Sequence, residues 1–220
     1  FEYCTSLNEI RIPAKIRSLD KYAFVNSGIR KVVFAAGSQC EKIGEQVFSG
    51  CNALESIDLP TSVKTIGDQA FANCSSLKSM DLSKVETIGI AVMSGCSGLK
   101  DILLPENITE IGDRMFYGCS ALETLMMPAG VTKIGKYAFA RCSSLNSIPV
   151  TDGLTEICEY AFAKCASLKN IVIPPKVSLV GDSAFYMCEN LTEVHLAHQD
   201  SIVLGASLFR ECNRLSDVEL

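Results

Sequence analysis

The sequence predicts a solenoid of about nine to ten stacked repeats, and three observations indicate this fold class. Cysteine recurs every 22 to 24 residues, phenylalanine stands three residues before most of these cysteines, and an alternating apolar segment begins three residues after them. Repetition at one period indicates structural units that bury their apolar side chains against neighbouring copies. We therefore expect one domain, residues 1–220, built mostly from short parallel strands with short helical turns.

The cysteines define the repeat register, because nine of the eleven fall on it. The register cysteines are Cys4, Cys51, Cys74, Cys96, Cys119, Cys142, Cys165, Cys188 and Cys212, with Ser27 in the vacant slot. No pair of them has the C-x-x-C spacing of a metal site, and stacked copies hold their Cβ atoms too far apart for an ordinary disulfide. We expect reduced cysteines that pack as small core residues.

Each repeat contains the segment L-x-x-I-x-I, usually followed by proline, as in Leu54, Ile57, Leu59 and Pro60. Alternation with a period of two predicts a strand with one buried face, and the proline ends the strand because it lacks a backbone donor. The segment V-x-x-I-G follows, and its glycine is expected to supply a backbone conformation or a close approach. The last segment, D-x-A-F-x-x-C, is interpreted as a short helical turn whose Ala, Phe and Cys point inward.

The complete pattern, L-x-x-I-x-I-P-x-x-V-x-x-I-G-x-x-A-F-x-x-C, resembles the leucine-rich repeats of the BspA-like surface protein family over essentially the whole chain. Departures include Met93 in the phenylalanine slot and Asp20 and Cys158 in the glycine slot. The resemblance implies a leucine-rich-repeat solenoid, α/β by class, that winds as a right-handed superhelix. It also implies a cell-surface or extracellular protein that binds another protein or a host matrix component without catalysis.

Composition excludes several other classes of function. The net charge is −5, and no apolar run approaches the roughly 18 to 20 residues that span a bilayer, so the chain is not expected to cross a membrane. Basic residues are sparse and do not interleave with exposed aromatic residues in the sequence, so nucleic acid is not an expected partner. The chain begins and ends inside a repeat, so we expect a fragment or processed part of a longer protein whose caps lie elsewhere.

Few residues are available for catalysis or metal binding. The two histidines, His195 and His198, are followed by Asp200, and this H-x-x-H pair is either a metal pair or, as we favour, a solvated pair. No serine or cysteine nucleophile has an evident base partner, so no catalytic residue, cofactor or metal is predicted. Cys40 and Cys158 lie outside the register and are the candidates for a reactive thiol, with simple burial as the alternative for each.

The middle residue of each I-x-I segment points away from the core, so these residues form one exposed column on the sheet. The column consists of Arg11, Val33, Asp58, Asp81, Leu103, Met126, Pro149, Val172, His195 and Glu219. The apolar run from Leu103 to Val172 is typical of a protein-binding surface when polar residues flank it. Two alternatives stay open: strand propensity alone selects these residues, or a neighbouring segment covers them.

The column leaves two functions open. In the first, the chain recognises a partner through the exposed sheet face. In the second, it is a structural spacer, stalk or self-associating scaffold that projects another domain. The expected assembly is a monomer or a weak homo-oligomer.

Overall fold

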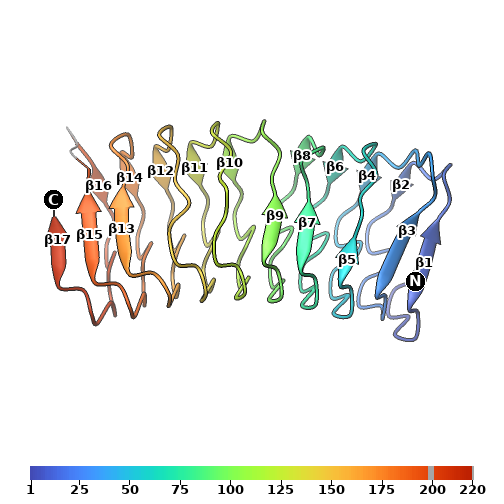
Figure 1. Ribbon diagram of the computed structural model, residues 1–220, viewed down its shortest axis with the longest axis horizontal. Helices are drawn as coiled ribbons and strands as arrows, with labels where there is room; N and C mark the ends of the chain where they lie inside the picture. The colour runs from blue at the N-terminus through green and yellow to red at the C-terminus, as the bar shows by residue number, and fades with distance from the viewer. Residues whose placement is uncertain (198–200, 220) are drawn as a thin grey trace. The chain divides into compact units, whose positions relative to one another are not determined.

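A computed structural model describes residues 1–197 and 201–219 and confirms the solenoid, whose short strands stack in parallel (Figure 1). Most repeats contribute two strands. The first strand comes from L-x-x-I-x-I, and the second comes from the residues just before the glycine of V-x-x-I-G. Contacts divide the chain into two compact units, Phe1–Pro105 and Glu106–Leu220. Each unit is described by itself.

Unit 1 contains two sets of parallel strands. Its first strands are β1 (Glu9–Ile12), β3 (Lys31–Phe34), β5 (Ser56–Ile57), β7 (Ser79–Asp81) and β9 (Asp101–Leu103). They pair in the order β1-β3-β5 and as β7-β9. Its second strands pair in chain order as one sheet: β2 (Ser18–Leu19), β4 (Lys42–Ile43), β6 (Thr65–Ile66) and β8 (Thr87–Ile88).

Unit 2 has a continuous sheet of second strands and a shorter sheet of first strands. The second strands, paired in this order, are β10 (Glu110–Ile111), β11 (Lys133–Ile134), β12 (Glu156–Ile157), β14 (Leu179–Val180) and β16 (Val203–Leu204). The first strands are β13 (Asn170–Ile173), β15 (Glu193–Leu196) and β17 (Asp217–Glu219). Two repeats of this unit, around residues 124–127 and 147–150, have no first strand.

The glycine after most second strands permits close backbone packing, as expected from its position, and Gly112 is an exception. A Cβ atom built on Gly67 would lie 2.7 Å from the backbone nitrogen of Glu45, and one on Gly181 would lie 2.6 Å from that of Glu159. Real Cβ atoms do not approach backbone this closely. The absence of a side chain therefore allows one repeat to contact the backbone of the repeat before it.

The D-x-A-F-x-x-C segments differ from the prediction, because no helix occurs in residues 1–197 and 201–219. Each segment is a series of turns with two left-handed residues, such as Gln69 (φ 54°) and Asn73 (φ 60°). Alternate amides donate to the next repeat, as Phe48 does to Ala70 O at 2.8 Å. In a helix these amides would donate along the helix axis. The turn conformation leaves them free to donate to the next repeat.

The core is formed by stacked copies of the same side chains. Phe24, Phe48 and Phe71 stack with ring centroids 5.4 to 5.5 Å apart in unit 1. Phe116, Phe139 and Phe162 stack 5.2 Å apart in unit 2. The rings of Phe48, Phe71, Phe116, Phe139, Phe162 and Phe185 are completely buried. Each ring thus packs against its own copies, as the repeat period requires.

The register cysteines lie beside this aromatic stack and make a repeated hydrogen bond. Cys74 Sγ donates to Phe48 O, and Cys165 Sγ donates to Phe139 O, both at 3.1 Å. Ser27 fills the same slot, and its Oγ lies 3.3 Å from Cys51 Sγ. The slot therefore accepts a small side chain that can form a hydrogen bond, and serine meets this requirement as cysteine does.

Candidate recognition surfaces

The first-strand face of unit 1 carries the first half of the predicted column. Pairing aligns Arg11 with Val33 and Asp81 with Leu103, so the structure places these members side by side. Arg11, Asp58 and Asp81 are exposed, Val33 is partly buried, and 58% of Leu103 is exposed. The hydroxyl and the backbone amide of Ser83 donate hydrogen bonds to the Asp81 carboxylate, and these bonds lower the pKa of Asp81. This half is mostly polar and ends at one exposed leucine.

The first-strand face of unit 2 carries the second half. Met126 is 87% exposed, and Val172 on β13 is 53% exposed. Pairing aligns Val172 with His195 and His195 with Glu219. The exposed residues therefore change from apolar to ionisable along the first strands β13, β15 and β17.

Pro149 departs from the expected position, because its side chain is buried and Val150 is exposed instead. The segment around Pro149 forms no strand, and neither does the segment around Met126. A proline has no backbone N–H to donate to the preceding segment, which removes one bond of a parallel pairing. The missing donor therefore weakens pairing between the segment around Pro149 and the segment before it.

Of the predicted histidine pair, the structure describes His195 alone. His195 Nδ1 lies 2.6 Å from Glu219 Oε2, an exposed contact between β15 and β17. His198 and Asp200 lie outside the described residues. Residues 1–197 and 201–219 contain no group of three or more His, Cys, Asp or Glu side chains arranged to hold a metal ion.

The two cysteines outside the register are both buried, which favours the simpler interpretation of them. Burial raises the pKa of Cys158 to about 12, and its Sγ lies 3.3 Å from Glu156 Oε1. Burial also raises the pKa of Cys40. A thiol with a raised pKa is a poor nucleophile at neutral pH. All eleven cysteines are free thiols, and the exposed one is Cys4.

A shallow polar depression of about 400 Å³ lies on unit 2. Its lining residues are Glu123, Ser144, Asn146, Ser167, Lys169 and Asn190. Asn190 Nδ2 donates to Ala166 O at 2.8 Å, so part of this lining is fixed. These residues precede the first-strand positions of their repeats and give the face a polar border.

Sequence reasoning missed a set of aromatic and basic residues on the turn segments of unit 2. Arg114 lies over Tyr137 and Arg141 lies over Tyr117, and both rings are partly buried. These residues are far apart in sequence and become neighbours only when repeats stack. Aligning the repeats in register would have shown that these residues occupy neighbouring slots.

Comparisons with known proteins agree with this repeat. The family model of the BspA type leucine rich repeat region matches residues 1–82, 34–146 and 132–220, in six copies. A leucine-rich repeat protein of Bacteroides ovatus is 25% identical with a TM-score of 0.71, over 98% of this chain and 67% of that one. A leucine rich cell surface protein of Faecalibacterium prausnitzii is 24% identical with a TM-score of 0.60, over 97% and 79%.

A leucine rich repeat protein of T. pallidum is 24% identical with a TM-score of 0.59, over 95% of this chain and 84% of that one. A search of curated proteins gave no match. Among residues 1–197 and 201–219 there is no helix with the length and apolar character to cross a membrane.

Proposed function

Because the chain belongs to the BspA-type leucine-rich repeat family, we propose that it is a non-catalytic recognition module at the cell surface. The module binds a protein or host matrix component through its first-strand face. The surface location extends to this chain the description of the F. prausnitzii neighbour as a cell surface protein. In such a scaffold the buried residues repeat, and the outward residues are free to differ between repeats.

The proposal is carried by the exposure of Met126, at 87%, on the first-strand face of unit 2. An exposed methionine contributes little burial energy to folding, so stability gives no reason to keep it there. Val172 is also exposed on the same unit, and Ser147 and Asn170 are exposed polar neighbours. Apolar side chains with a polar border are typical of protein-binding surfaces, and methionine adapts its shape to a partner.

Replacing Met126 and Val172 with serine tests this assignment. We expect the purified double variant to lose most of its binding to a coat of purified extracellular-matrix proteins, measured by surface plasmon resonance. Its melting temperature should stay close to that of the wild type, since both side chains are exposed. A separate Leu103→Ser variant tests the exposed leucine of unit 1.

Val203→Ser is the matched control, because Val203 is an apolar residue of unit 2 that is 63% exposed on a second strand, β16. This control should bind like the wild type. Equal binding by the double variant would contradict the proposal. If the double variant loses only self-association, measured by sedimentation velocity, the spacer or self-associating scaffold is the correct function.

A further inference from the structure

The turn segments of unit 2 carry a second surface of stacked tyrosine and arginine side chains. The rings of Tyr137 and Tyr160 stack with centroids 4.9 Å apart and planes within 1°. The Arg114 guanidinium lies 4.7 Å from the centroid of Tyr137, and Tyr186 meets Tyr160 edge-on at 6.3 Å. One line of contacts therefore runs from Arg114 to Tyr186 across four repeats.

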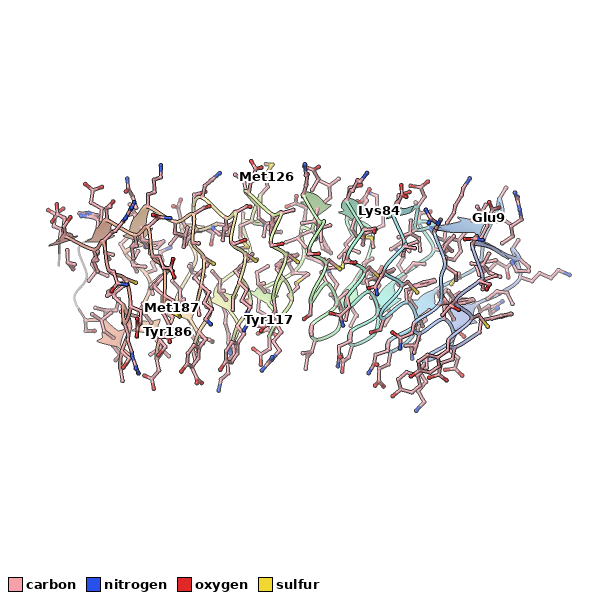
Figure 2. All side chains as sticks on the ribbon, turned by 90° about the horizontal axis from the view of Figure 1, so that it is seen from below. Glu9, Lys84, Tyr117, Met126, Tyr186 and Met187 are labelled. Carbon is pink, nitrogen blue, oxygen red and sulfur yellow. The ribbon has the colours of Figure 1, made fainter. Side chains whose placement is uncertain are left out.

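A second set of contacts holds the cations in place beside this line. Arg114 and Arg141 each lie 5.7 Å from the centroid of Tyr117. Contact with a ring face orients a planar guanidinium and limits its motion. Figure 2 shows Tyr117, Tyr186 and Met187 along one edge of unit 2, whereas Met126 lies along the opposite edge. This surface is therefore separate from the first-strand face.

Three cations of this surface have no carboxylate partner among the described residues. Arg114, Arg141 and Lys164 are exposed, and within residues 1–197 and 201–219 none of them forms a salt bridge. Neighbouring Lys136 differs, because its Nζ lies 3.3 Å from Glu159 Oε2. The surface thus presents unpaired positive charge on a chain whose net charge is −5.

These side chains also occupy backbone positions that do not suit them. Arg114, Tyr137 and Tyr160 have φ values of 55°, 56° and 54°, and Arg141 and Lys164 have values of 64° and 63°. The left-handed region costs a residue other than glycine or asparagine on the order of 1 to 2 kcal/mol. Unit 1 holds no cation in the same two slots: they contain Gln46, Gln69, Ala91, Asn26, Gly50, Asn73 and Gly95, together with Tyr22 and Tyr3. Folding therefore does not require tyrosine and arginine here.

We propose that this turn surface of unit 2 binds an acidic segment of a partner protein. Carboxylates of the segment pair with Arg114, Arg141 and Lys164, and tyrosine hydroxyls provide further hydrogen bonds. Tyrosine and arginine are the residue types most enriched in the energetic centres of protein interfaces. The Tyr137 ring has Arg114 from the preceding repeat and Tyr160 from the following repeat against it, so its faces are not free to stack on a sugar or a nucleobase.

The test measures binding of a fluorescent deca-glutamate peptide to the 220-residue chain by anisotropy at low ionic strength. The test variant combines Arg114→Gln with Arg141→Asn. Gln69 and Asn73 occupy the same two slots of another repeat, and circular dichroism checks that the double variant folds. We expect the double variant to bind at least about tenfold more weakly, which corresponds to the loss of two charge contacts.

A charge-matched control replaces Lys84 and Lys176, which are exposed cations outside this surface, with glutamine. The control should keep its affinity within about twofold of the wild type. The proposal fails if the wild type does not bind the peptide, or if the control loses as much affinity as the test variant. Tighter binding of a single-stranded oligonucleotide or a sulfated oligosaccharide of equal charge would also overturn it. The Met126 and Val172 variant should keep peptide binding, so the two proposals fail separately.

Discussion

The two units have the same buried structure. Phe48 in unit 1 and Phe139 in unit 2 are both completely buried between phenylalanine rings of adjacent repeats. Cys74 and Cys165 donate the same hydrogen bond to the phenylalanine carbonyl of a preceding repeat. The close agreement shows that the core constrains a few inward positions of each repeat and that these positions tolerate little change.

The two units differ on the outward side of the turns. Arg114, Arg141 and Lys164 occupy the left-handed turn slots in unit 2, whereas unit 1 holds no cation there and has tyrosine or small and polar residues such as Gln69 and Gly95. Backbone conformation is the same, with φ between 52° and 76° in both units for these slots. Because the backbone conformation is shared, we attribute the cations of unit 2 to the proposed binding of an acidic segment.

The largest expected effect tests the shared core. Phe48→Ala and Phe139→Ala should each lower the free energy of unfolding by about 3 to 5 kcal/mol, because each removes a completely buried ring from a stack. The two losses should agree within about 1 kcal/mol, measured by urea unfolding followed by circular dichroism. A loss at one site that is less than half the loss at the other would show that the two cores are not equivalent.

A smaller effect concerns the buried thiols at high pH. Burial raises the pKa of Cys96 in unit 1 and of Cys142 in unit 2 to about 12, whereas the unfolded chain loses these protons near pH 9.0. Between these values the unfolded state binds fewer protons than the folded state. The free energy of unfolding should therefore fall as pH rises, by about 1.4 kcal/mol per pH unit for each thiol.

The variants Cys96→Ser and Cys142→Ser measure this contribution, because a serine hydroxyl donates a hydrogen bond but does not titrate in this range. Ser27 shows that the slot accepts serine. Each variant should show a shallower loss of stability from about pH 9 to about pH 10 than the wild type, by a similar amount in both units. An unchanged slope in either variant would mean that the thiol titrates equally in both states.

The repeat and its core could be predicted from the sequence because they depend on spacing. A residue that recurs at one period must meet its own copies, so Phe71, Cys74 and Ile57 are identified as core without any coordinates. The turn could not be predicted in the same way. Ala70, Phe71 and Cys74 point inward both in a short helical turn and in a series of turns with left-handed residues. Only the hydrogen bonds between repeats distinguish the two conformations.

The candidate surfaces were less predictable, for two physical reasons. The alternation of apolar residues in the sequence predicts the exposure of Met126, although no strand forms there, but it does not predict the burial of Pro149. The contact between Arg114 and Tyr137 requires side-chain positions in successive repeats. Sequence gives the neighbouring slots, but only the structure shows that the cation lies over the ring.

The smallest expected effect tests whether the residues in the turn slots of unit 2 lower the free energy of unfolding. Lys164 has a φ of 63°, and glycine adopts this conformation without a steric penalty. After the entropy cost of glycine in the unfolded chain, Lys164→Gly should raise the free energy of unfolding by about 0.5 kcal/mol. The reciprocal change in unit 1, Asn73→Lys, should lower it by about the same amount, because asparagine tolerates this conformation better than lysine. Urea unfolding measures both.

The stability of Lys164→Gly has to be interpreted together with its binding of the acidic peptide. If Lys164→Gly is more stable and binds the acidic peptide more weakly, lysine is kept in unit 2 for its charge at a cost in folding free energy. If Lys164→Gly is less stable than the wild type, the lysine side chain stabilises the turn. The contrast between the two units would then have a folding explanation at this slot, and the binding interpretation would be wrong there.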